Sequence, residues 1–303
     1  MAEQVLVSRD RGWRTWVARG AAWARGHPQI GIFMLMVPLL VYLGVLFAYP
    51  LTRMIRISLF DPGFTLEHYV HFFAVPVYFK VLVNTVRIAL IVTVICLILG
   101  YPVAYLLSIA PAHLRNILFI AVLIPWWTST LVRTYAWMVI LGRNGIINQT
   151  LLGLGLISEP LRLMYNTLGV VIGMVHVQLP LAILPLYSVM SGIDRGLLQA
   201  AQSLGAGTFQ TFRRVFFPLS MPGVTGAALL LIVGNMGFYI TPALLGGPAN
   251  VLIAQLIDSQ VSGLINWEFG SAIAVILLVI SLVFFFLYNR LLGLDRLLGG
   301  RLS

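Results

Sequence analysis

The sequence predicts an all-α membrane protein with six transmembrane helices, and three observations support this prediction. The chain of 303 residues is 60% hydrophobic and only 9% charged, whereas soluble domains carry about 25% charged residues. Its mean hydropathy is +0.97. Six separate runs are each long and apolar enough to cross a bilayer, which takes a helix of about 20 mostly apolar residues. A chain of this composition cannot cover a water-facing surface with polar groups, so it belongs in lipid.

The first predicted span, Ile30–Leu51, follows a basic segment. Residues 1–29 hold five arginines and three tryptophans, a composition that suits the surface of a membrane. We interpret this segment as an anchor that orients the chain, in preference to a lipid-binding element. The run is longer than the apolar part of a cleavable signal, so we expect it to be retained. Tyr49-Pro50 is expected to mark the exit of this run.

Five further apolar runs predict the remaining spans: Thr85–Ala110, Asn116–Leu141, Leu168–Ile193, Gly223–Gly246 and Ser271–Leu292. The third is the least apolar, because Arg133 lies near its end. Prolines recur inside the spans and are expected to kink them. Such kinks serve either ordinary helix packing or the hinges of a pathway that opens to each side in turn. We expect one transmembrane domain over residues 30–292, followed by a cytoplasmic tail, 293–303.

Basic residues predict the orientation, because they concentrate in cytoplasmic segments. With six spans, both termini share a side with the second and fourth loops. That side holds twelve of the basic residues: Arg9, Arg11, Arg14, Arg19, Arg25, Arg115, Arg195, Arg213, Arg214, Arg290, Arg296 and Arg301. The opposite side holds seven: Arg53, Arg56, Lys80, Arg87, Arg133, Arg143 and Arg162. We therefore expect both termini in the cytoplasm. The spread of these residues over span ends also argues against a nucleic-acid partner.

The fourth loop, residues 196–223, has the pattern of two short helices. Leu197, Ala200, Ala201 and Leu204 repeat at helical spacing and predict one apolar face. Such a loop either lies on the bilayer or docks a partner, and interfacial helices are usually longer and more basic than this one.

A glycine pair separates the two predicted helices. Gly205-Ala-Gly207 is expected to cap the first helix, since glycine readily takes the left-handed conformation needed there. Aromatic residues at helical spacing then predict the second helix: Phe209, Phe212 and Phe216. Pro218 is expected to end it, and Pro222-Gly223 to turn the chain back into the membrane. The result would be a compact plug with aromatic knobs.

This loop resembles the EAA motif of type I ABC importer permeases, E-A-A-x3-G-x9-I-x-L-P. The positions that correspond are Gln199, Ala200, Ala201, Gly205, Val215, Phe217 and Pro218. Gln199 replaces the usual glutamate and removes a charge. The resemblance implies a type I (MetI-like) permease fold and a loop that grips a separate ATPase. The implied ATPase-coupling residues are Gln199, Ala200, Ala201, Gly205, Phe209, Phe212, Phe216 and Pro218.

Further segments resemble the first-type permease subunit of spermidine/putrescine importers, over about Tyr49 to Leu292: 125–137, 141–148, 169–180 and 239–248. The resemblance implies a bacterial inner-membrane subunit that pairs with a second, related permease. It also implies two ATPase subunits, a periplasmic solute-binding protein and no cofactor. The wider subfamily imports opines, aminophosphonates and ferric iron as well, so opines and other amino-acid conjugates remain an alternative to polyamines.

The chain lacks the residues of an enzyme. It has no G-x-x-x-x-G-K-[ST] phosphate loop, and its sole lysine, Lys80, has no glycine nearby. We therefore expect a non-catalytic subunit that depends on a separate nucleotidase. Metal ligation is not expected, since His68, His71 and Glu67 are too few ligands. A stand-alone secondary transporter would need an ion site within the membrane, and no carboxylate lies deep in a predicted span.

The residues expected to line the path are aromatic or charged side chains near the span ends: Phe238, Tyr239, Arg133, Tyr135, Trp137 and Asp258. Aromatic faces and carboxylates suit a cationic solute. A buried arginine needs a partner or an aqueous surface, and it would favour a solute that carries a carboxylate. Arg133 is equally able to reach the outer headgroups. The tryptophans also fit an interfacial belt, and His176 either lines a cavity or packs within the protein.

Overall fold

The computed structural model describes residues 28–61 and 63–292, and within these ranges every regular element is helical. The expected surface segment up to residue 27 and the tail 293–303 lie outside the described residues. The chain divides into two compact units, Met1–Arg56 and Ile57–Ser303.

Helix α2, Pro28–Phe60, includes the first predicted span. The helix passes through Tyr49-Pro50, the expected exit of the span, and continues to Phe60. In the next turn the Thr52 hydroxyl donates to the carbonyl of Ala48 at 2.8 Å. Prolines are tolerated inside spanning helices, because neighbouring groups and local adjustments of the backbone satisfy the carbonyl that the proline leaves free.

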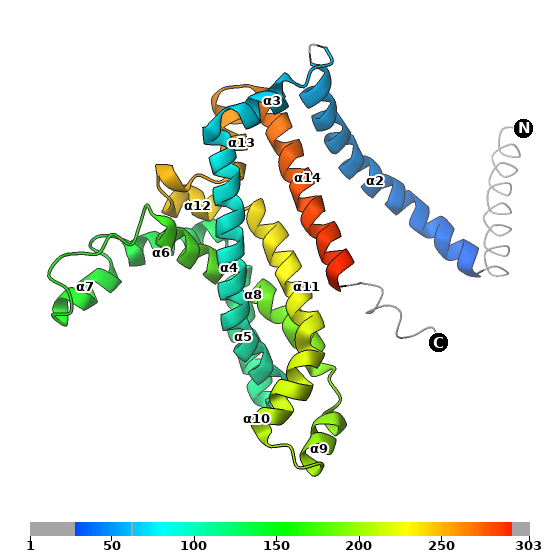
Figure 1. Cartoon of the computed structure of the whole chain (residues 1–303), viewed down its shortest axis with the longest axis vertical. Coiled ribbons are helices and arrows are strands. Elements are labelled where there is room, and N and C mark those ends of the chain that lie inside the picture. The colour runs from blue at the N-terminus through cyan, green and yellow to red at the C-terminus, as the bar shows by residue number, and fades with distance from the viewer. Residues whose placement is uncertain (1–27, 62, 293–303) are drawn as a thin grey trace, which may run out of the picture. The chain divides into compact units, whose positions relative to one another are not determined.

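Three helices form the centre of the second unit: α4 (Pro76–Ile109), α8 (Thr167–Ser191) and α11 (Phe217–Met236). They pack against one another along their lengths (Figure 1). Their shared core includes the fully buried residues Ile88, Val92, Cys96, Met174 and Leu231. The prediction of the fourth span is confirmed to within two residues, whereas α4 begins nine residues before the expected start of the second span.

The third predicted span is broken. It consists of α5 (Ala112–Trp127) and α6 (Thr130–Leu141), and the segment Thr130–Gly153 leaves the axis of α5 at 95°. The break follows a proline: both the amide and the hydroxyl of Thr128 donate to the carbonyl of Pro125, at 3.3 Å and 2.7 Å. These bonds close the last turn of α5 and divert the chain. The expectation of one continuous helix over Asn116–Leu141 is therefore wrong.

The fifth span begins and ends earlier in the sequence than the predicted range, Gly223–Gly246. A continuous helix runs from Thr208 to Met236, through α10 (Thr208–Thr211), the π-turn η1 (Phe212–Phe216) and α11. Pro218 does not end it. In the π-turn the Phe217 amide bonds back to the carbonyl of Phe212, and this wider turn relieves the clash between a proline ring and the preceding turn. Pro222 likewise lies inside the helix.

Short elements follow the fifth span before the last one begins. They are α12 (Ile240–Leu245), η2 (Pro248–Asn250), α13 (Ile253–Asp258) and the π-turn η3 (Ser259–Gly263). The last span is α14 (Trp267–Leu292). In the described residues, five helices are long and apolar enough to cross a membrane, and the bent pair makes a sixth if it counts as one span.

The two ends of the second unit carry different elements. Helix α9 (Arg195–Ser203) and α10 lie at one end, and α3 (Glu67–Ala74) and α13 lie at the other (Figure 1). Helix α7 (Ile146–Gly153) continues from α6 to the side of the central helices. The loop that contains α9 is thus separated by the length of the spans from the loops around α3 and α13.

Candidate functional site

The loop that resembles the coupling motif forms a compact structure, which we call the coupling knob and define as residues 195–216. Its first helix, α9, is capped at the start by Asp194, whose carboxylate accepts from the Gly196 amide at 2.8 Å. At the end of α9, Gly205 has a φ of +88°. The Ala206 amide donates to the Ala201 carbonyl at 3.1 Å, which closes the helix across that glycine. The predicted left-handed cap is confirmed.

The outer surface of the knob is apolar. Leu204 is 89% exposed and Phe209 75% exposed, and Leu197 and Ala200 are exposed beside them. The side chain of Gln199 is also exposed. Apolar side chains grouped at a loop tip are typical of an interaction surface, so the knob presents a face that suits a protein partner.

Two of the three aromatic side chains of the knob, Phe212 and Phe216, point toward the spans. Phe216 is only 4% exposed, and its ring packs edge-on against Tyr105 of α4, with 5.0 Å between ring centroids. Phe212 contacts Tyr105 as well, at 5.6 Å. Both rings therefore pack toward the spans, because residues four apart share a helix face and α4 covers that face. Of the three aromatics, Phe209 alone is on the outer surface, and the other two fix the knob to the spans.

A further bond joins the knob to α4. Arg195 donates from Nη2 to the carbonyl of Ser108, in the last turn of α4, at 3.2 Å. A cation at the end of a helix complements the partial negative charge of its free carbonyls. Together with the aromatic contacts, this bond makes the knob an extension of the central helices.

A second group of candidate residues lies on the bent third span. Arg133 is 8% exposed, and its Nη2 donates to the Thr130 hydroxyl at 3.2 Å. Its Nε and Nη1 atoms are buried and make no hydrogen bond within the described residues. These two atoms carry three of the five N–H donors of the guanidinium.

The neighbouring Thr134 hydroxyl lies 3.1 Å from that of Thr241, which joins α6 to α12.

Trp137 stands one helical turn beyond Arg133, so the two side chains share a face of α6. Its ring packs edge-on against His176 of α8, with 5.5 Å between centroids. The buried Nδ1 of His176 has no hydrogen-bond partner within the described residues. Tyr135, by contrast, is 52% exposed and takes no part in this group. The structure therefore brings together Arg133, Trp137 and His176 and leaves Tyr135 apart.

The remaining path candidates lie beyond the end of α11. Phe238 is partly buried against the central core, whereas Tyr239 is exposed. The Tyr239 hydroxyl donates to Oδ2 of Asp258 at 2.8 Å. This hydrogen bond raises the pKa of Tyr239 above its ordinary value, so the phenol keeps its proton. Two candidates chosen separately from the sequence thus form one pair.

Sequence reasoning missed a chain of polar side chains inside the central helices. Gln178 of α8 donates to Asn235 of α11 at 2.9 Å, and Asn235 donates to Thr93 of α4 at 3.4 Å. Asn and Gln side chains inside predicted spans are a sequence signal for such a hydrogen-bonded series, because hydrogen bonds between helices satisfy polar groups in lipid. These bonds fix the register of the three central helices.

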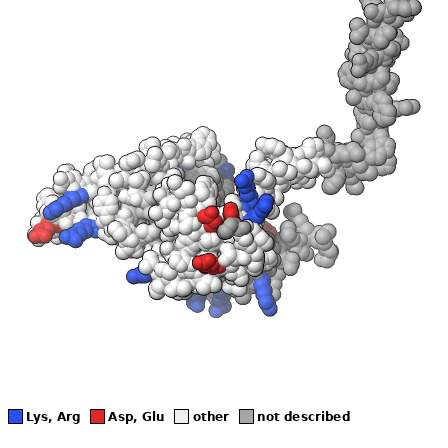
Figure 2. Space-filling model, turned by 90° about the horizontal axis from the view of Figure 1, so that it is seen from above, with Lys and Arg blue, Asp and Glu red and all other residues white. Residues whose placement is uncertain are grey.

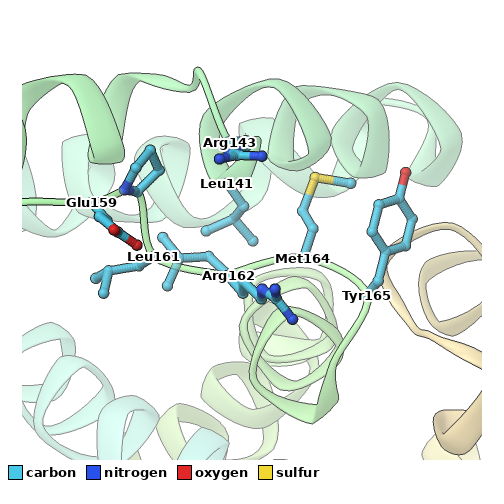
Figure 3. Close-up of a pocket in the computed structure, with 9 residues that line it drawn as sticks. Leu141, Arg143, Glu159, Leu161, Arg162, Met164 and Tyr165 are labelled. Carbon is cyan, nitrogen blue, oxygen red and sulfur yellow. The ribbon is translucent and has the colours of Figure 1, made fainter.

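A cavity of about 530 Å³ lies beside the loop that follows α7. Its lining includes Arg143, Glu159, Arg162 and Tyr165 (Figure 3). Asn148 holds this loop: it donates to the carbonyls of Gly142 and Leu161, each at 3.1 Å, and accepts from the amide of Leu161. The loop is therefore a built part of the fold, although sequence reasoning assigned it no role.

The histidines of the first outer loop pack against aromatic rings. His71 lies 5.1 Å from Phe269 and 5.5 Å from Tyr78 between ring centroids. Within the described residues, no group of three or more His, Cys, Asp or Glu side chains is arranged to hold a metal ion.

The described helices include five that are long and apolar enough to cross a membrane, which indicates a membrane-embedded protein. The chain belongs to the family described as binding-protein-dependent transport system inner membrane components, whose model matches residues 29–292. It is thus the permease component of an ABC transporter, a non-catalytic subunit of a multi-pass inner-membrane assembly.

Individual relatives agree with this assignment. The chain is 39% identical over 259 residues to the spermidine/putrescine transport system permease protein PotB of Haemophilus influenzae, covering 86% of this chain and 89% of that one. It is 38% identical over 227 residues to PotB of Escherichia coli, covering 75% and 82%. A bacterial ABC transporter involved in alginate import has the same fold, with a TM-score of 0.65, 17% identity and coverage of 92% and 99%.

Proposed function

We propose that this permease carries polyamines such as spermidine and putrescine into the cell, with energy from ATP hydrolysed by separate subunits. Identity of 39% to a spermidine/putrescine permease over most of both chains supports the solute. The exposed apolar surface of the coupling knob, held by Gly205 and Phe216, is the observation that carries the coupling mechanism.

The knob is proposed to bind an ATPase subunit. Leu204 and Phe209 supply its outer contacts together with Gln199 and Ala200, while Ala201, Gly205, Phe212, Phe216 and Pro218 shape and anchor it. Gln199 makes a neutral contact where the family usually has a carboxylate. Closure of two ATPases on ATP would pull two knobs together, and the contacts with α4 would pass that movement to the spans.

The assembly that we infer contains this chain, a second related permease, two ATPases and a periplasmic binding protein. Both termini of this chain lie in the cytoplasm, as the excess of basic residues on that side supports. Membrane lipid surrounds the outer surfaces of the spans, and no nucleic acid takes part. The proposed path between the two permeases is lined by Phe238, Tyr239, Arg133, Tyr135, Trp137 and Asp258.

Reconstitution tests this function. Vesicles that contain both permeases and the ATPases, with the binding protein on the outside, are expected to accumulate labelled putrescine or spermidine only with ATP inside. Accumulation without any nucleotidase would instead indicate a stand-alone transporter. A complex that hydrolyses ATP but accumulates neither polyamine would contradict the proposed solute.

The side chain of Arg133 favours a second class of transported solute. Its buried guanidinium has unpaired donors, and a solute with a carboxylate would supply the missing acceptor. Opines carry a carboxylate as well as an amine, so an opine is the second solute to test in the same vesicles. A polyamine has no group that pairs with Arg133, and faster uptake of an opine would favour this second class.

A further inference from the structure

Two irregular segments of backbone meet beyond the end of α11. The helix stops at Met236, and residues 237–239 form a short non-helical break before α12. On the other segment, α13 passes into the π-turn η3, in which the Leu264 amide donates to the carbonyl of Ser259 at 2.9 Å. π-turns and broken helices are frequent at functional sites, and in transporters they commonly hold the solute site.

The break and the π-turn place two hydroxyl side chains around one carboxylate, that of Asp258. Asp258 is the last residue of α13, and Tyr239 from the break donates to its Oδ2 at 2.8 Å. Ser262, from the π-turn, donates to its Oδ1 at 2.9 Å. Both oxygens of the carboxylate are therefore held in place by neutral donors, and each retains a further acceptor position.

The charge of this carboxylate is not compensated by a side chain of the described chain. No Lys, Arg or His within the described residues comes within 4.0 Å of Asp258 to form an ion pair, and the carboxyl group is only partly buried. The surface seen from above in Figure 2 is largely uncharged, with Lys and Arg as well as Asp and Glu side chains in small groups. A fixed carboxylate on such a surface attracts a cation from solution.

The surroundings of Asp258 favour an organic ammonium group over a metal ion. A metal ion needs more ligands than one carboxylate, and no cluster of three ligands occurs in the described residues. An ammonium group needs one strong acceptor and gains from an aromatic face. Tyr239 is 41% exposed and stands directly beside that acceptor. A charge-assisted hydrogen bond to Asp258 and a cation–π contact with Tyr239 would act together.

We propose that Asp258, held by Tyr239 and Ser262, binds the ammonium group of the transported solute at the mouth of the path. This inference rests on the proposed function for the existence of a translocated amine. It deepens that function by assigning the amine a site: Asp258 supplies the charge, Tyr239 orients it and covers the amine, and Ser262 holds the second carboxylate oxygen.

The test compares variants of the complete transporter in vesicles, at saturating amounts of the loaded binding protein, with labelled putrescine. Asp258→Asn keeps the size of the side chain but removes its charge and turns one of its two acceptors into a donor, and we expect at least a tenfold slower uptake. Tyr239→Phe keeps the ring and removes the hydroxyl, so a smaller loss, about threefold, is expected. The matched control is Glu268→Gln in the first turn of α14, which makes the same chemical change nearby and is expected to leave uptake unchanged.

A second measurement separates loss of the site from loss of folding. Equilibrium binding of labelled putrescine to the purified complex without the binding protein is expected to weaken about tenfold in Asp258→Asn, while ATP hydrolysis and the melting temperature stay at the wild-type level. Wild-type uptake and binding in Asp258→Asn would overturn the ammonium site and leave polyamine import standing. If the wild-type complex moves no polyamine, the proposed solute fails, and the same comparison with labelled octopine decides whether Asp258 recognises an amine.

Discussion

The ring of Phe216 packs edge-on against the ring of Tyr105, with 5.0 Å between their centroids. Phe216 ends the coupling knob, and Tyr105 belongs to α4, one of the three central helices. Buried aromatic rings in contact resist separation, since each such pair adds to the stabilisation from burial alone. A force applied to the knob therefore acts on a central span through a direct contact.

Loss of the Phe216 ring is expected to loosen the knob from the spans. Phe216→Ala removes a side chain that is 4% exposed, and truncation of a buried phenylalanine costs about 3–5 kcal/mol. We expect a lower melting temperature of the purified transporter and ATP hydrolysis that no longer drives uptake. Phe209→Ala is the control, because that ring is 75% exposed and its loss should not change the melting temperature. Equal melting temperatures for the two variants would contradict this anchoring role.

The cap of α9 is expected to depend on glycine. Gly205 has a φ of +88°, a conformation that costs other residues about 1–2 kcal/mol and β-branched residues more. A Cβ at this position would meet no atom within 4 Å, so Gly205→Val tests the backbone conformation alone. We expect uptake to fall while the ATPases remain bound. Gly207→Ala is the control, since its surroundings are open and its φ is −65°. Full transport by Gly205→Val would count against a rigid knob as the lever.

The outer surface of the knob is expected to hold the ATPase through apolar contacts. Leu204→Asp places a charge on a side chain that is 89% exposed, so folding should be unaffected while burial of that side chain against a partner becomes costly. We expect the ATPase to be lost when the permease is purified. Leu156→Asp, in the exposed loop after α7, is a control expected to retain it. Retention of the ATPase by Leu204→Asp would place the contact elsewhere.

The guanidinium of Arg133 is expected to reduce stability in the isolated permease. It is 8% exposed with unpaired donors, and a buried charge without a partner is costly. Arg133→Met keeps the length of the side chain and removes the charge. We expect a melting temperature several degrees higher and slower uptake of a solute that carries a carboxylate, such as an opine. Arg143→Met, on an exposed arginine, should change neither. A lower melting temperature for Arg133→Met would mean that the charge is already paired.

Much of this architecture was predictable from the sequence, because lipid imposes a local requirement on each span. Long apolar runs were sufficient to identify the membrane-spanning segments, and four helical positions with a following glycine were sufficient to identify α9 and its left-handed cap at Gly205. These features depend on residues close together in the chain, where periodicity and backbone conformation are directly encoded.

Contacts between distant residues were decided by the tertiary structure alone. Pro125 predicted a kink in Asn116–Leu141 but not a bend of 95°, and the spacing of Phe212 and Phe216 could not show that Tyr105 covers them. The pairing of Tyr239 with Asp258 joins residues 19 positions apart. Such contacts arise from the way that helices pack, and packing depends on the shapes of all neighbouring side chains. The sequence by itself determined that this chain is a membrane permease with a helical loop between its fourth and fifth spans, and folding decided which side chains that loop exposes and that Tyr239 pairs with Asp258.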